Sequence, residues 1–261
     1  MAQWSAFPYD DTDYSVNTAA LKKQWPRLHI GDAEPLPKEA AVLAAWALFH
    51  AGAFQQAYDA GLKAAASGHP AGITVANKAQ AIYATYLEKS EKTRLAMFQE
   101  VAERAEAQAA EDPKNAGAHY WTAYALGRYS QGISVVKALS QGLGAKVKTA
   151  LETTIKLQPK HADAHIALGA FHAEVIDKVG KLLGRTQGAD AATGLRMFQQ
   201  ALQLNPGSAI AMVEHANGLV MLEGDKRMKE AEALYAQAAA CQAADAMERL
   251  DIEMAKAELE D

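Results

Sequence analysis

Three histidines lie close together in this chain, and histidine is one of the side chains from which proteins build zinc sites. His161 and His165 would lie one turn apart on a helix, and His172 follows with Glu174 close behind. Such a site needs several ligands that converge on one point. The His-Glu-x-x-His pattern of the zinc proteases does not occur in the chain. The histidines are therefore candidate metal ligands on spacing alone.

Other motifs that could do chemistry are incomplete. Residues 180–186, Gly-Lys-Leu-Leu-Gly-Arg-Thr, resemble a phosphate-binding loop but lack its Gly-Lys-Ser/Thr ending and a preceding strand. Cys241 is the only cysteine, has no obvious activating base nearby, and is expected to be a small core residue. We therefore predict that the protein is not an enzyme and that it has no catalytic residues, no cofactor and no metal.

The composition of the chain limits the kinds of partner that it can bind. The chain of 261 residues has a net charge of −5, with acidic and basic residues mixed along it, so a nucleic-acid partner is not expected. No stretch is long and apolar enough to predict a membrane span. The single cysteine fits a reducing compartment, and the N-terminus lacks the charged and apolar regions of a secretory signal. These features predict a cytoplasmic protein.

One phrase of the sequence returns at a nearly fixed interval. Asp-Pro-Lys-Asn-Ala-Gly-Ala-His at 112–119 recurs as Gln-Pro-Lys-His-Ala-Asp-Ala-His at 158–165 and, less well kept, as Asn-Pro-Gly-Ser-Ala-Ile-Ala-Met at 205–212. The prolines of the three copies, Pro113, Pro159 and Pro206, are 46 and 47 residues apart. A period of this kind indicates stacked units, each of which contacts only its neighbours.

The elements between these prolines are predicted to be helices. We expect an all-α, right-handed superhelical solenoid of about five helical hairpins, closed by an amphipathic C-terminal capping helix. An N-terminal arm at 1–37 would carry a short helix near 18–24, the repeat domain would span 38–243, and the capping helix would occupy 244–261. The predicted helix pairs are 38–51 with 54–66, 73–87 with 93–110, 116–127 with 145–157, 162–176 with 191–204, and 208–222 with 229–240. Partly apolar inserts at 128–144 and 177–190 separate the helices of the third and fourth pairs.

The fourth unit resembles the tetratricopeptide repeat (TPR), a helix–turn–helix of about 34 residues with small residues, Leu-Gly, an aromatic residue and a final proline at set places. It carries Ala162, Leu168-Gly169, Phe198, Ala201 and Pro206. With its longer units, the region 100–245 is similar to the TPR proteins called regulator of microtubule dynamics and their bacterial relatives. The periplasmic TPR component of some transporters has similarly irregular repeats, but it would need an export signal.

The resemblance implies which faces of the first helices point into a concave groove and which pack inside each hairpin. The groove residues that it indicates, with those one position beyond, are Tyr120, Tyr124, Arg128, Ile166, Ala170, Glu174, Val213 and Asn217. The same comparison places His165 and His172 at packing positions and His161 in the loop before its helix. We therefore expect buried, hydrogen-bonded histidines at these places.

An apolar groove of this kind predicts a scaffold that binds a protein or peptide segment. Chaperone-binding TPR domains hold a C-terminal carboxylate with Lys and Asn, and here only Asn217 matches that pattern. The alternative is a carrier for a small amphipathic or apolar ligand, in a cavity roofed by the two inserts. The sequence leaves open the identity of the partner, the formation of a homo-oligomer, and whether Trp4 and Trp25 of the arm fill the groove.

Overall fold

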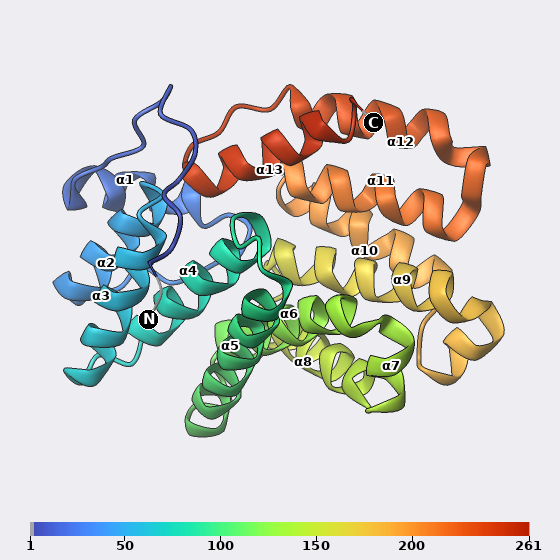
Figure 1. Ribbon diagram of the computed structural model, residues 1–261, viewed down its shortest axis with the longest axis horizontal. Coiled ribbons are helices and arrows are strands. Elements are labelled where there is room, and N and C mark those ends of the chain that lie inside the picture. Colours follow the sequence, from blue (N-terminus) through green and yellow to red (C-terminus); the bar gives the residue numbers. More distant parts are fainter. Residues whose placement is uncertain (1–2, 261) are drawn as a thin grey trace.

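The computed structural model describes residues 3–260, and within this range the chain forms helices and no β-strand, as predicted (Figure 1). The N-terminal half contains α1 (Thr18–Leu28), α2 (Ala40–His50), α3 (Phe54–Ala66), α4 (Gly72–Tyr86), α5 (Glu91–Glu111) and α6 (Ala116–Ile133). It is followed by α7 (Val135–Ser140), α8 (Leu143–Leu157), α9 (Ala162–Thr186), α10 (Ala191–Leu204) and α11 (Ala209–Glu223). A 3-10 turn, η1 (Gly224–Arg227), leads to α12 (Met228–Ala239) and α13 (Ala246–Ala257).

At each copy of the repeated phrase, one helix ends and the next helix begins. Each copy places a capping side chain two residues after its proline, and this side chain accepts a hydrogen bond from the first turn of the next helix. The three bonds run to Asn115 from the amide of Ala118 at 3.0 Å, to His161 from Ala164 at 3.1 Å, and to Ser208 from Ala211 at 3.2 Å. The caps fix where α6, α9 and α11 begin, and so align the first helices of three successive units.

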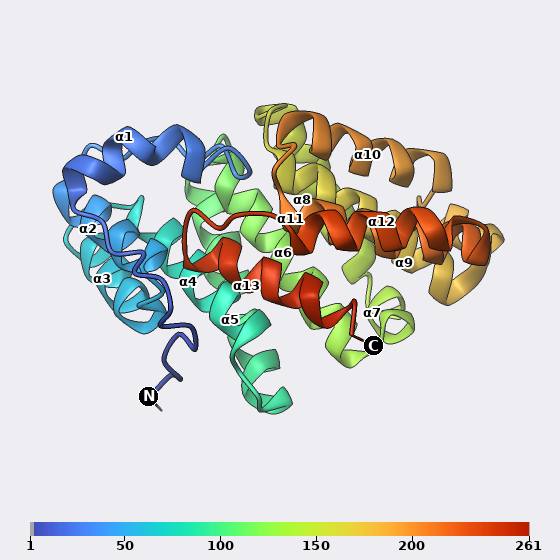
Figure 2. The same cartoon turned by 90° about the horizontal axis from the view of Figure 1, so that it is seen from above.

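Small residues let the hairpins pack closely. Gly61 and Gly72 bring the backbones of α3 and α4 together, since a Cβ on Gly61 would lie 2.6 Å from the carbonyl oxygen of Gly72. Phe198 of α10 is fully buried with its ring edge against Gly169 of α9 and Gly218 of α11. Successive helices therefore form one continuous stack, which curves round so that α13 returns along α11 and α12 to the region of α2 (Figures 1 and 2).

Both inserts are largely helical. α6 continues through the first insert to Ile133, and the short α7 follows it. α9 continues through the second insert to Thr186 and bends at Gly180, whose φ of 77° takes it out of helical geometry. Because α6 is lengthened, α7 lies at the edge of the molecule, packed against α6, α8 and α9 (Figure 1).

The described part of the N-terminal arm, residues 3–37, packs on the first two hairpins. Trp4 stacks on Tyr83 with ring centroids 4.4 Å apart, and Trp25 stacks on His29 at 3.9 Å and meets Trp46 edge-on. The helix expected near 18–24 is α1, which continues past Pro26 to Leu28. Both tryptophans of the arm are thus used in the N-terminal core.

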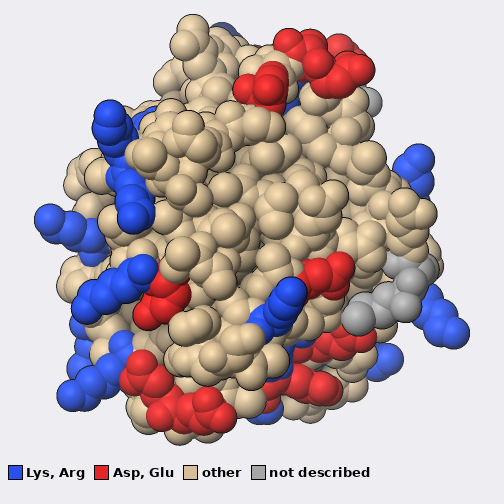
Figure 3. Space-filling view, turned by 90° about the vertical axis from the view of Figure 1, so that its left-hand side faces the viewer, with Lys and Arg blue, Asp and Glu red and all other residues tan. Residues whose placement is uncertain are grey.

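Charge is mixed on the face formed by the N-terminal hairpins. Lys and Arg side chains stand beside Asp and Glu around an area with few charges, and neither sign forms a continuous patch there (Figure 3). Among residues 3–260, no helix has both the length and the apolar character needed to cross a bilayer.

Candidate functional site

A pocket opens on the concave side of the stack. Its walls come from the first helices of successive units, α4, α6, α9 and α11, while α7 and α8 close one end and α13 covers another side. It encloses about 1110 Å³, including the part that is open to solvent. Apolar and aromatic side chains form most of the wall, and a few polar groups enter it, which is the usual composition of a binding site.

Six of the eight predicted groove residues line this pocket: Tyr120, Tyr124 and Arg128 from α6, and Ile166, Ala170 and Glu174 from α9. Val213 and Asn217 of α11 lie elsewhere. Val213 packs in a cluster with Ala238 of α12 and Ile252 of α13, and Asn217 accepts a hydrogen bond from the Tyr235 hydroxyl. α12 and α13 cover that face of α11, so α11 turns Ile210 and Glu214 toward the pocket instead.

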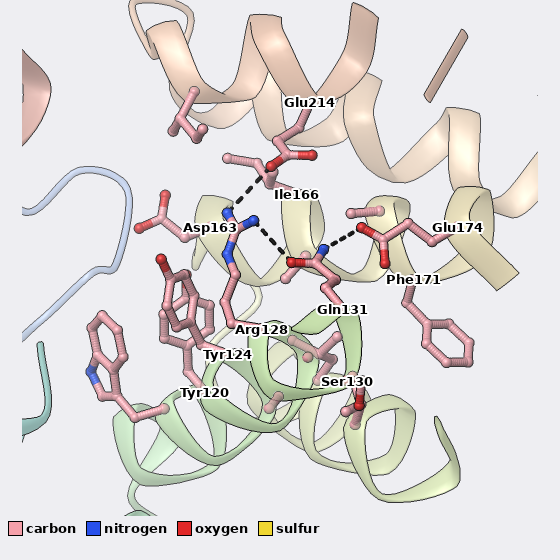
Figure 4. Close-up of a pocket in the computed structure, with 18 of the residues that line it drawn as sticks. Tyr120, Tyr124, Arg128, Ser130, Gln131, Asp163, Ile166, Phe171, Glu174 and Glu214 are labelled. Atoms are coloured by element: carbon pink, nitrogen blue, oxygen red, sulfur yellow. Dashed lines mark hydrogen bonds and ion pairs between the residues drawn. The ribbon is translucent and has the colours of Figure 1, made fainter. Parts of the chain in front are cut away.

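A row of polar groups crosses the pocket around Arg128 (Figure 4). Its guanidinium lies over the Tyr124 ring, 5.4 Å from the centroid, and contacts Glu214 at 3.5 Å and the amide oxygen of Gln131 at 3.2 Å. The amide nitrogen of Gln131 donates in turn to Glu174. The row therefore links α6 to α9 and α11 across the pocket.

The two carboxyl groups of this row, Glu174 and Glu214, have different electrostatic surroundings. Burial raises the pKa of Glu174 to about 7, and the nearby charge of Glu214 adds to this effect. Burial acts to lower the pKa of Arg128, but Tyr124 and Glu214 reverse this, so its guanidinium remains charged. Arg128 is ion-paired with Glu214, whereas Glu174 is held through a neutral amide.

A second polar group stands on the other side of Arg128 from Glu174, around Asp163 (Figure 4). Burial, followed by the charge of Asp32, raises the pKa of Asp163 to about 7. Asp251 of α13 lines the same part of the pocket and accepts a hydrogen bond from the Tyr86 hydroxyl. Its pKa is raised well above the usual range by burial, with contributions from the charges of Asp245 and Asp163.

The histidines that suggested metal chemistry are used in packing. His165 contacts the carbonyl oxygen of Pro159 at 3.1 Å, and His119 repeats this contact one unit earlier, 3.0 Å from Pro113. His172 accepts from the amide of Asp190 at 3.1 Å, and His161 caps α9. This confirms the expectation of hydrogen-bonded histidines at these positions. Across residues 3–260, no group of three or more His, Cys, Asp or Glu side chains is arranged to hold a metal ion.

Comparison with known proteins agrees with this architecture. The family described as regulator of microtubule dynamics protein 1-3 matches residues 47–259. The chain belongs to this family. Among solved structures, it is similar to a thermophilic TPR protein of Thermus thermophilus, at 17% identity and a TM-score of 0.59, over 83% of this chain and 97% of that one. No curated protein matches. The likeness to the Thermus protein establishes a TPR-like fold.

In this family member, several pocket residues lie outside the predicted groove set. Gln131, Glu214, Tyr86 and Asp251 carry much of its polarity. Gln131 lies one helical turn after Arg128, so its position could have been read from spacing. Asp251 meets Tyr86 across 165 positions of sequence, and no local pattern marks that contact. Of the two inserts, only the first contributes to the lining.

Proposed function

We propose that this protein is a non-enzymatic scaffold that binds a segment of a partner protein in the concave pocket. The observation that carries the proposal is the pocket itself, whose apolar wall is assembled from the first helices of several units. TPR-like repeats commonly mediate protein interactions, and a groove of this kind suits an amphipathic segment with its apolar face turned inward. The cytoplasmic location expected from the sequence belongs to the same proposal.

A second candidate, a carrier of a small amphipathic ligand, is favoured by one observation. α7 from the first insert and α13 from the C-terminus both cover the pocket, so it is more enclosed than an open groove. Enclosure of this degree suits a ligand that is largely buried when bound. Native mass spectrometry of the purified chain tests this candidate: a bound mass that is lost on unfolding would support it, and a clean apo mass would count against it.

The scaffold proposal is tested with a random-peptide library displayed on phage and selected on the purified full chain. Ala170→Trp fills the pocket from α9, and Ala236→Trp places the same side chain on the exposed surface of α12, away from the pocket. Selected peptides should bind Ala170→Trp at least about tenfold more weakly than the parent and bind Ala236→Trp unchanged. Thermal melting shows that both variants fold. Peptides that bind all three proteins equally would contradict the proposal.

A further inference from the structure

Acidic side chains outnumber basic ones in the lining of the pocket. Lys78 and Arg128 face Asp163, Glu174, Glu214 and Asp251. The charge of Lys78 is already matched, because its Nζ lies 2.6 Å from the buried carboxylate of Asp32. Arg128 is paired with Glu214, and burial disfavours the charged forms of the other three carboxyl groups, Asp163, Glu174 and Asp251. An occupant that carried a positive charge would favour those charged forms, and an anionic occupant would oppose them.

One end of the pocket also holds a polar group that lacks a partner. The Tyr120 side chain is only 6% exposed and lines the pocket, and its hydroxyl makes no hydrogen bond with any residue of the described part of the chain. Asp163 and Asp251 also line a smaller neighbouring pocket together, and Figure 4 shows Tyr120 and Asp163 on the same side of Arg128, so all three residues lie at one end of the main pocket. The hydroxyl is free to meet an occupant of the pocket, so this end of the pocket is suited to a donor from outside.

We propose that the partner segment inserts a lysine side chain into this end of the pocket, with its ammonium group held by Asp163, Asp251 and the Tyr120 hydroxyl. The inference rests on the proposed function and names what the scaffold recognises. An ammonium group has three donors and no acceptor, and these three groups, on α9, α13 and α6, offer it three acceptors.

The apolar wall accounts for the rest of the lysine side chain. Its four-carbon stem is apolar and normally lies along apolar surface while the charged head meets polar groups. Ile82 of α4 and Ile166 of α9 line the same pocket as the three acceptors and supply such a surface. Asp251 keeps an oxygen for the ammonium, since the Tyr86 hydroxyl donates to the other one. The site is therefore suited to a positively charged group at the end of an apolar carbon chain.

The test uses the peptides selected on the full chain, each made again with its lysine replaced by norleucine. This change keeps the four-carbon stem and removes the charged ammonium group. It should weaken binding to the parent protein by about tenfold or more, because a charge-assisted contact is lost. The same change should weaken binding to the Asp163→Asn variant by less than about threefold, because this variant already lacks the negative charge that pairs with the lysine. Asp177→Asn, an exposed carboxylate farther along α9, is the matched control and should behave as the parent does.

Asp251→Asn and Tyr120→Phe keep the shape of the pocket and should each reduce the lysine effect, so the proposal remains testable if Asp163→Asn fails to fold. Pocket-dependent peptides without lysine, or a norleucine effect equal in parent and Asp163→Asn, would overturn the lysine site and leave the scaffold function intact. A selection that yields no peptide sensitive to Ala170→Trp would overturn the scaffold function and the lysine site with it.

Discussion

Glu34, in the segment between α1 and α2, is a carboxyl group whose surroundings disfavour its charge. Burial raises its pKa to about 8, and the charge of Asp32 acts in the same direction against the opposing effect of Lys78. The folded protein therefore keeps a proton on Glu34 that the unfolded chain releases near pH 4.5. The stability that this neutral form provides is fully present below pH 4.5 and is lost as the pH rises through about 8.

Replacing Glu34 with Gln should remove this pH dependence, because the amide resembles the protonated acid and does not ionise. We expect the parent and Glu34→Gln to differ in free energy of unfolding by less than about 1 kcal/mol at pH 5, and the variant to be more stable by about 3–4 kcal/mol at pH 8. Urea denaturation at a series of pH values measures both. For Glu103→Gln, at an exposed position of α5, the free energy of unfolding should change with pH as it does in the parent. A Glu34→Gln curve parallel to the parent would contradict the assignment.

At the scale of the element, two glycines that lie within first helices have different surroundings. Gly218 of α11 faces the ring of Phe198, and an added Cβ would lie 2.3 Å from a ring carbon. Gly127 of α6 has nothing within 4 Å of the same position. The side chain is absent at Gly218 because the buried aromatic ring of the preceding helix takes its place, while Gly127 carries no such constraint.

Gly218→Ala should therefore destabilise the protein by about 1–3 kcal/mol, since Phe198 is fully buried and can move only by disturbing its neighbours. Gly127→Ala should stabilise it by about 0.5–1 kcal/mol, the ordinary gain of alanine over glycine inside a helix. Chemical denaturation of the two variants under one set of conditions gives the comparison. Equal effects of the same sign would show that helix propensity, and not the contact with Phe198, decides both.

Local sequence was enough to predict most of the helices and most of the first-helix groove, but not α7 or the extension of α6 and α9 into the inserts. Periodicity and the proline phrase located α6, α9 and α11, and their shared face brought Tyr120 and Ile166 to the pocket. The prediction failed to anticipate contacts made by distant segments. Val213 was assigned to the groove, but α13 folds back on α11 and buries it with Ile252. Asp251 reaches the pocket for the same reason, and its helix was expected only to cap the end of the stack.

At the scale of the whole molecule, a buried polar chain joins the two ends of the sequence. Asp245, at the start of α13, lies 2.6 Å from Nδ1 of His50, whose Nε2 lies 3.2 Å from Nε2 of His29. Nδ1 of His29 contacts Asp32 at 2.9 Å, and Lys78 completes the chain at 2.6 Å. Because a carboxylate only accepts, each Nδ1 donates its hydrogen bond to the neighbouring carboxylate. A linear repeat array has no such connection, since its units contact only their neighbours.

Asp245→Asn should loosen both ends of the molecule together. The amide keeps a side-chain oxygen for capping α13 at Glu248 but removes the carboxylate that pairs with His50, so the substitution tests the buried link and leaves the ion pair of Arg27 with Glu248 in place. Hydrogen exchange followed by mass spectrometry should show faster exchange, by about tenfold or more, in α1 and α2 as well as in α13, with α9 and α10 unchanged. Asp190→Asn alters the corresponding capping residue of α10, where the carboxylate is largely exposed, and its effect should stay within that hairpin. If Asp245→Asn affected α13 alone, the buried chain through His50 would not be the contact that couples the C-terminal helix to the N-terminal hairpins.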